Sequence, residues 1–154
     1  MAANLGYGVD DPTPEAVAQA AEEAQVRQDI EDFEQGFETL IGERGVTLSG
    51  GQKQRSTLAR ALMRRPRILI LDDALSAVDT HTEEAILGHL RQIMRGRTTL
   101  IIAHRVSSLR DADRIIILDE GRIAEQGTHE ELVKAGGFYA DLHARQQLAA
   151  ELET

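Results

Sequence analysis

The chain has 154 residues, about the length of one globular domain. Hydrophobic residues make up 42% and charged residues 28%, which is ordinary for a folded protein and excludes a disordered, highly charged chain. Because there is no cysteine, a disulfide framework, a cysteine-ligated zinc site and a cysteine nucleophile are excluded, and a reducing compartment is favoured. The five histidines lack close metal-ligand spacing. No secretory signal is readable, and apolar runs of about four residues are far shorter than the roughly 20 of a membrane-crossing helix.

The net charge of -9 is unevenly distributed. Residues 1–43 hold eleven acids and one base, whereas residues 44–154 hold fifteen acids and sixteen bases. Six of those cations and no acid fall between Lys53 and Arg67. The bulk charge therefore says little about which ligands the chain binds.

The first third of the chain has the pattern of a small, acidic, mostly helical unit over residues 1–47. Thr13 as N-cap and Pro14 at the first helical position predict a helix over residues 14–24. A second short helix is expected over 25–33, followed by an irregular segment. The sequence LSGGQ at 48–52 then leads into a helix that ends near Met63.

From residue 68 onward, strands and helices alternate. We expect, in order, a strand at 68–71, a helix at 82–94, a strand at 98–103, a short helix at 107–112, a strand at 115–118, a weaker strand at 123–125, a helix opened by a Thr128–Glu131 capping box, and a helix at 138–152. The continuous apolar runs predict strands buried on both faces of a parallel sheet, so the fold class is α/β. Asp72, Asp73 and His104 then follow strands at their carboxyl ends, where such sheets bind ligands.

Ser49, Gly50, Gly51 and Gln52 stand at the start of a predicted helix. One interpretation is structural, with Ser49 as N-cap and Gln52 completing a capping box. The other is a phosphate cradle, because free backbone N–H groups at a positive helix end, with no Cβ atoms nearby, attract anions. Capping explains Ser49 and Gln52 but not two successive glycines, each of which weakens a helix by up to about 1 kcal/mol relative to alanine.

Two further groups could carry chemistry. A carboxylate at the end of a buried strand, such as Asp72, can hold Mg²⁺, while a second one beside it, Asp73, can orient or deprotonate a water. Taken alone, an Asp-Asp pair more often ends a strand and caps the next element. His104 could bond a phosphate oxygen or a catalytic water, although a lone histidine after a strand is more often a turn residue.

The order and spacing of four segments carry more information than any one of them. LSGGQKQR at 48–55, ILILDD at 68–73, SAVD at 76–79 and AHR at 103–105 resemble, in this order, the signature motif, Walker B, D-loop and H-loop of the nucleotide-binding domain of ABC transporters. GERG at 42–45 and GTHEEL at 127–132 are similar to the exporter branch. The resemblance covers nearly the whole chain. It implies a helical subdomain over residues 1–65, including the signature helix, and part of a RecA-like P-loop NTPase core, a parallel sheet with flanking helices, over 66–154.

In this family, two nucleotide-binding domains sandwich two ATP molecules head to tail. The resemblance therefore implies that the signature residues 49–52 face the γ-phosphate of ATP held by a partner domain. The expected cofactors of the complete domain dimer are ATP and Mg²⁺, and tight binding to this chain alone is not expected. The expected partners are a second nucleotide-binding domain and a transmembrane domain. The expected location is the cytoplasmic side of the plasma membrane.

The resemblance also implies roles for residues outside the signature. Asp72 would bind Mg²⁺, usually through water, and His104 would contact the γ-phosphate. Ser76 and Asp79 of the D-loop would bridge to the partner's site. Asp73 and His104 are the candidate catalytic residues.

One departure from the family pattern is large. The sequence contains no Gly-x-x-x-x-Gly-Lys-[Ser/Thr] phosphate loop, which supplies the N–H cradle and the lysine on the β- and γ-phosphates. The family's adenine-stacking aromatic residue and its Q-loop glutamine are missing too. The sequence therefore predicts a fragment, the back half of a nucleotide-binding domain, which is inactive by itself.

A second departure is smaller. Where the family has a catalytic glutamate after the Walker B aspartate, this chain has Asp73. Losing one methylene retracts the carboxylate by roughly 1–1.5 Å, and a displacement of that size can cost about 10²-fold in rate. The same substitution marks heterodimeric ABC exporters with one degenerate and one competent ATP site. The sequence thus predicts a half-transporter whose intact signature completes its partner's site.

Two other functions are open at this stage. The chain could be a non-catalytic module that pairs with a complete nucleotide-binding domain, since a parallel sheet without its neighbouring strands exposes an edge. It could also be an ATPase of the chromosome-maintenance or DNA-repair type. No nucleic acid is expected as a partner, however, because aromatic residues for base stacking are absent from residues 44–137 and no long heptad segment is present.

Overall fold

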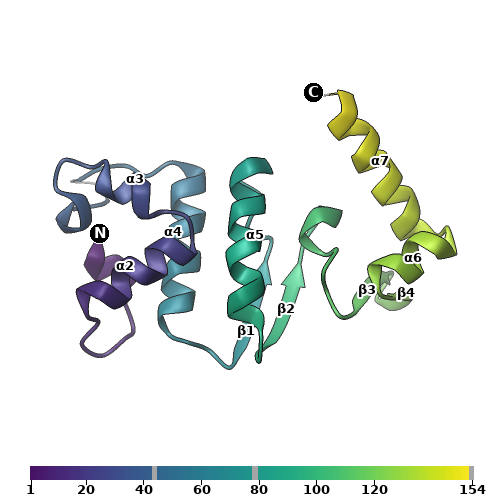
Figure 1. Cartoon of the computed structure of the whole chain (residues 1–154), viewed down its shortest axis with the longest axis horizontal. Helices are drawn as coiled ribbons and strands as arrows, with labels where there is room; N and C mark the ends of the chain where they lie inside the picture. The colour runs from purple at the N-terminus through teal and green to yellow at the C-terminus, as the bar shows by residue number, and fades with distance from the viewer. Residues whose placement is uncertain (43–44, 78–79, 153–154) are drawn as a thin grey trace. The chain divides into compact units, whose positions relative to one another are not determined.

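The computed structural model describes residues 1–42, 45–77 and 80–152 of the chain. It contains two compact units, of which the first ends at Leu100 and the second begins at Ile101. Strands and helices are both present, with a helix between the first two strands and two helices after the last strand (Figure 1), which confirms the predicted α/β fold class. The domain boundary expected after Arg65 stays a prediction. Within the described ranges, no helix is long and apolar enough to cross a bilayer.

The first unit begins with three helices, α1 (Ala2–Leu5), α2 (Pro14–Glu23) and α3 (Arg27–Glu31). The predicted start of α2 is confirmed, because Thr13 Oγ1 accepts a hydrogen bond from Ala16 N at 3.2 Å and Pro14 opens the helix. The helix predicted over 25–33 is shorter than expected. Gln25 has a left-handed backbone (φ 54°), which no continuous right-handed helix accommodates, so α3 begins only at Arg27. A 3-10 turn, η1 (Gly36–Glu38), follows.

The signature segment begins helix α4 (Gly50–Met63), which lies against α1 and α2. The buried apolar residues of these three helices form one side of the first unit's core: Leu5, Val17, Ala20, Ala21, Leu58, Ala59 and Leu62. Burying a side chain of leucine size contributes about 1.5–3 kcal/mol. This packing, more than helix propensity, stabilises α4.

A two-stranded parallel sheet is made by β1 (Ile68–Asp72) and β2 (Thr98–Ile102), with α5 (Thr80–Met94) between them in the chain, and the first unit ends within β2. The prediction that these strands are buried on both faces is wrong. Along β1, Leu69 and Leu71 are buried, whereas Ile68 and Ile70 are 63% and 61% exposed. The reason is that one face has packing partners among the described residues and the other does not. Leu100 and Ile102 of β2 are likewise exposed.

The second unit holds η2 (Val106–Ser108), β3 (Ile115–Asp119), β4 (Arg122–Gly127), α6 (His129–Ala135) and α7 (Phe138–Leu152). The expectation that 115–118 continues the parallel sheet is wrong, since β3 pairs antiparallel with β4. The short Glu120-Gly121 turn, with both residues at positive φ, returns the chain directly to its neighbour, which only an antiparallel pair permits. The helix predicted at 107–112 is the shorter 3-10 turn η2. The capping box of Thr128 and Glu131 is confirmed.

Tyr139 is the centre of the second unit's core. Its side chain is fully buried with Val106, Ile115 and Leu132 around it. Its hydroxyl lies 2.9 Å from His129 Nδ1, and burial raises the pKa of Tyr139. Burial also lowers the pKa of His129, helped by the neighbouring His143 and Arg110. The core therefore links α6 and α7 through a neutral pair, and it fixes α7 beside the segment that follows His104.

Candidate functional site

The LSGGQ segment forms a capped helix start. Ser49 has an extended backbone, its Oγ accepts a hydrogen bond from Gln52 N at 3.2 Å, and Gln52 Oε1 accepts one from Ser49 N at 3.0 Å. The predicted capping box is therefore confirmed. Ser49 and Gly50 are exposed, and a Cβ added at Gly50 would come no closer than 3.8 Å to its first neighbour, Ala77 Cβ. Packing against the described residues thus gives no reason for a glycine at position 50.

Asp29 on α3 holds this helix start from the side. Its Oδ1 accepts a hydrogen bond from Gln52 Nε2 at 3.0 Å, and its Oδ2 pairs with Arg55 Nη2 at 2.8 Å. The side chains of Arg55 and Asp29 are only 13% and 28% exposed. The amide of Gln52 is thus engaged on both sides, by Ser49 and by Asp29. Sequence reasoning missed Asp29, because nothing local marks an acid 23 residues before its partner.

A second glutamine of the same helix, Gln54, holds the turn after β1. Its Nε2 donates to Ser76 Oγ at 3.0 Å and to Asp73 O at 3.3 Å, and its Oε1 accepts from Ala77 N at 2.9 Å. Ser76 Oγ in turn donates to Asp73 O at 3.1 Å. The structure therefore brings Asp73 and Ser76 together with the signature helix, as one hydrogen-bonded group. Asp79, the other D-loop residue of the prediction, lies outside the described residues.

The two candidate carboxylates differ in their surroundings. Asp72 ends β1 and is exposed, whereas Asp73 is half-buried and has a left-handed backbone (φ 47°). That conformation is uncommon for a residue other than glycine, and the hydrogen bonds of Gln54 and Ser76 to the Asp73 carbonyl stabilise it. No group of three or more metal-ligating side chains occurs in the described part of the chain.

His104 belongs to the second unit, where it follows β2 and is exposed. Its carbonyl accepts a hydrogen bond from Gln146 Nε2 of α7 at 2.8 Å. The same amide accepts one from Val106 N through Oε1, also at 2.8 Å. The backbone around His104 is thus attached to a helix that begins more than thirty residues later in the chain.

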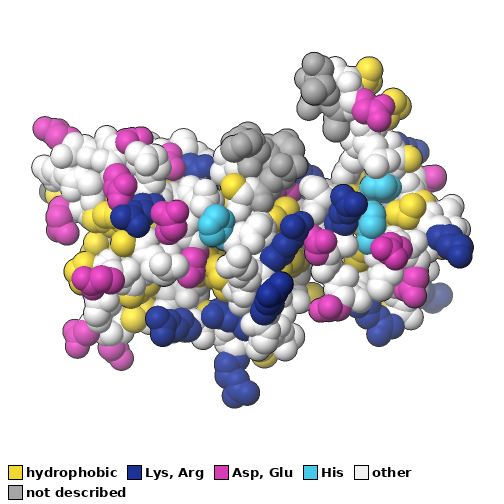
Figure 2. All heavy atoms as spheres, viewed as in Figure 1, with side chains coloured by type: hydrophobic (Ala, Val, Ile, Leu, Met, Phe, Trp, Pro, Cys, Tyr) yellow, Lys and Arg dark blue, Asp and Glu magenta, His cyan; other side chains and the backbone are white. Residues whose placement is uncertain are grey.

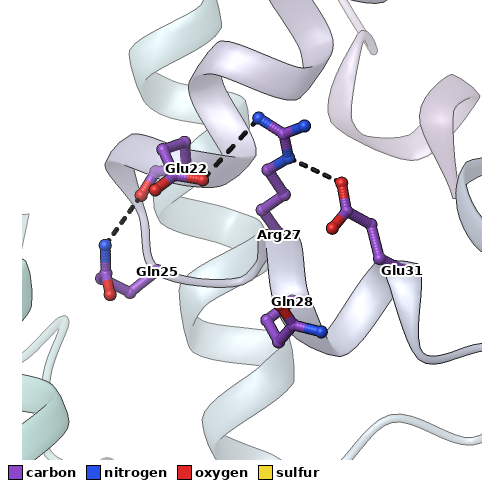
Figure 3. A pocket seen from close by; sticks show the side chains of 5 residues that line it. All are labelled: Glu22, Gln25, Arg27, Gln28 and Glu31. Atoms are coloured by element: carbon purple, nitrogen blue, oxygen red, sulfur yellow. Dashed lines mark hydrogen bonds and ion pairs between the residues drawn. The ribbon is translucent and has the colours of Figure 1, made fainter.

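A hollow on the first unit lies away from these groups, between the end of α2 and α3. Figure 3 shows Arg27 at its centre, paired with Glu31 at 2.7 Å and with Glu22 at 3.9 Å. Gln25 also lines it and donates to the Glu22 carbonyl at 3.1 Å. Two of its carboxylates thus already pair with Arg27. Acidic side chains are spread over the N-terminal helices around it (Figure 2).

Comparison with known proteins decides the family. A family model described as ABC transporter matches residues 4–76. An ATP-dependent lipid A-core flippase of Hahella chejuensis is 52% identical over 144 residues, which are 93% of this chain and 25% of that protein. A probable multidrug resistance ABC transporter ATP-binding/permease protein of Bacillus subtilis is 51% identical over 94% of this chain. The chain belongs to the ABC transporter family.

The structural relatives agree with this assignment. The solved structure of a bacterial Atm1-family ABC exporter with ATP bound matches with a TM-score of 0.88 and 46% identity, over 95% of this chain and 26% of that one. The predicted resemblance to ABC exporters is thus confirmed. The chain spans about a quarter of the length of the curated ABC transporter relatives that it matches.

Replacing Gln54 with alanine tests the connection between the signature helix and the turn after β1. Each net hydrogen bond is worth about 0.5–1.5 kcal/mol, so the Ala77 amide, which donates to Gln54 Oε1, should exchange its hydrogen about two- to tenfold faster. Nuclear magnetic resonance of the full chain measures this rate. Lys53→Ala is the matched control, because Lys53 is the adjacent, exposed residue of the same helix. Equal exchange in both variants would contradict the assigned contact.

Proposed function

We propose that this chain presents the ABC signature motif to ATP held by a second nucleotide-binding domain, in an ABC exporter at the cytoplasmic side of the plasma membrane. The observation that carries the proposal is the helix start at Ser49 and Gly50. It is exposed, it is already capped from within, and its glycine is not required by packing. Exposed N–H groups at a positive helix end are the features that an anionic phosphate needs.

The residues present also fit the expected cofactors. Mg²⁺ is commonly bound by one or two carboxylates together with phosphate oxygens and water, so a lone exposed Asp72 suffices as the protein's contribution. Bound Mg²⁺ would supply charge neutralisation at the phosphates of ATP. His104 is exposed and its backbone is fixed by α7, which suits a residue that contacts the γ-phosphate. Ser76 supports the same turn and belongs to the contact with the partner domain.

The chain's own ATP site is proposed to be degenerate because Asp73 replaces the longer catalytic glutamate. A general base has to come within about 3 Å of the proton it takes. The Asp73 backbone is held by Gln54 and Ser76, so the main chain cannot advance to compensate for the missing methylene. Asp73 would therefore bind the attacking water less closely than a glutamate does, and ATP hydrolysis at this site would be slow.

Asp73→Glu, made in the complete transporter that contains this segment, tests the proposal. Restoring the methylene should raise hydrolysis at this domain's own site, by up to about 10²-fold. The measurement is single-turnover hydrolysis with the partner's site inactivated. Asp113→Glu, an equivalent change at an exposed aspartate in the loop before β3, is the control and should leave the rate unchanged. Equal rates for Asp73→Glu and the control would contradict a degenerate site caused by the shorter side chain.

A further inference from the structure

The side-chain amide of Gln146, on α7, forms hydrogen bonds with the backbone on both sides of Arg105, the residue that follows His104. Gln146 Nε2 donates to the His104 carbonyl and Gln146 Oε1 accepts from the Val106 N–H, each at 2.8 Å. These two backbone groups flank Arg105, which precedes the 3-10 turn η2. Two bonds from one planar amide fix the direction of the backbone as well as its position.

From this geometry we infer that Gln146 is a positioning residue, which fixes the backbone that carries His104 and thereby the direction in which the His104 side chain leaves it. The inference rests on the proposed function, since it assigns Gln146 a part in the same reaction. Gln146 itself makes no contact with the reacting groups in this assignment. It acts through the main chain on either side of Arg105.

The packing of α7 supports this role. Val106 is 4% exposed and belongs to the core cluster with Tyr139 of α7, against which Leu142 also packs. Gln146 lies one helical turn after Leu142, so the apolar contact and the amide contact lie on the same face of α7. The apolar contact anchors the turn, and the amide determines how the backbone that leads to it is oriented. His104 itself stays exposed, so its ring is free to meet a ligand.

The chemistry of the contact requires glutamine. A carboxamide supplies one acceptor and two donors, and here the acceptor meets an N–H while a donor meets a carbonyl. Glutamate keeps the acceptor for Val106 but places a carboxylate oxygen against the His104 carbonyl. Asparagine is one methylene shorter and cannot keep both 2.8 Å contacts without moving the loop. Replacement by glutamate therefore separates the two halves of the contact.

The first measurement uses the full chain without nucleotide, so its result does not depend on the proposed function. Hydrogen exchange of the Val106 amide should be about fivefold faster in Gln146→Ala and close to wild type in Gln146→Glu, because glutamate keeps the acceptor. The ring signals of His104 should shift in both variants. Gln147→Ala, the adjacent exposed residue of α7, is the matched control. Unchanged Val106 exchange in Gln146→Ala would overturn the inference.

The second measurement is a double-mutant cycle in the complete transporter. Gln146→Ala should lower the kcat of ATP hydrolysis about fivefold with little change in KM, and it should have almost no further effect once His104 is alanine. Additive losses would overturn the positioning role, because Gln146 would then act independently of His104. If His104→Ala alone leaves kcat unchanged, the proposed function of His104 fails. In that case the Val106 exchange rate still decides whether Gln146 holds the loop.

Discussion

Replacing Asp29 with alanine should lower the free energy of unfolding of the first unit by about 2–3 kcal/mol, because Arg55 would lose its acidic partner in a mostly buried place. Asp29 also accepts the hydrogen bond from Gln52 Nε2, so two contacts of α4 disappear together. Nε of Arg55 is already buried without a partner among the described residues, which leaves the guanidinium with few ways to compensate. Urea unfolding of the full chain, followed by far-ultraviolet circular dichroism, measures the loss.

Glu31→Ala is the matched control for this prediction. Glu31 lies on the same helix and also pairs with an arginine, Arg27, at 2.7 Å. Those two side chains are 42% and 45% exposed, and an exposed pair of this kind is worth only about 0–1 kcal/mol. The expected difference between the variants therefore comes from burial rather than from the number of ion pairs. Equal losses in the two variants would show that Asp29 is an ordinary surface charge.

Replacing Glu125 with alanine should destabilise the second unit by about 2 kcal/mol. Its two carboxylate oxygens accept hydrogen bonds from Phe138 N at 2.5 Å and Tyr139 N at 3.2 Å, the first two N–H groups of α7. A carboxylate at a helix N-terminus gains from charged hydrogen bonds and from the helix dipole. Loss of this cap frees the helix start next to the core residue Tyr139. Thermal unfolding of the full chain is the measurement.

Gly137→Ala should produce nearly the same loss for a different reason. A Cβ at position 137 would overlap Glu125 Oε1 and lie 2.9 Å from Glu125 Cδ, so the carboxylate would have to leave. The two substitutions remove one contact, and the double variant should therefore be scarcely less stable than either single one. Glu151→Ala, at an exposed acid near the other end of α7, should change stability by less than about 0.5 kcal/mol. Additive losses for Glu125→Ala and Gly137→Ala would contradict the shared mechanism.

The sequence predicts well what depends on neighbours three or four residues apart. The caps at Thr13, Ser49 and Thr128 are confirmed, because the donor and the acceptor of each cap lie three residues apart in the sequence. The order of strands and helices is confirmed as well, because the apolar pattern of each element is also local in the sequence. The family assignment came from four motifs in sequence, which is again a property of the linear chain.

Contacts between distant segments could not be predicted. Asp29, Gln54 and Gln146 reach partners 19 to 42 residues away, and no periodicity marks them. The prediction that β1 is buried on both faces is wrong for a different reason. A continuous apolar run shows that both faces of a strand are hydrophobic, but not that other elements cover both of them. The roles of the signature residues, Asp72, Asp73 and His104 remain proposals.

Two backbone segments are each held by a neutral side-chain amide, the turn after β1 by Gln54 and the segment after His104 by Gln146. Dissolved salt screens exposed ion pairs such as Arg27–Glu31, with a Debye length of about 8 Å at physiological ionic strength. A hydrogen bond between uncharged groups is weakened much less by salt. The geometry of these segments should therefore be the same in dilute buffer and at high salt concentration. A side-chain amide also adds no net charge to the segment that it holds.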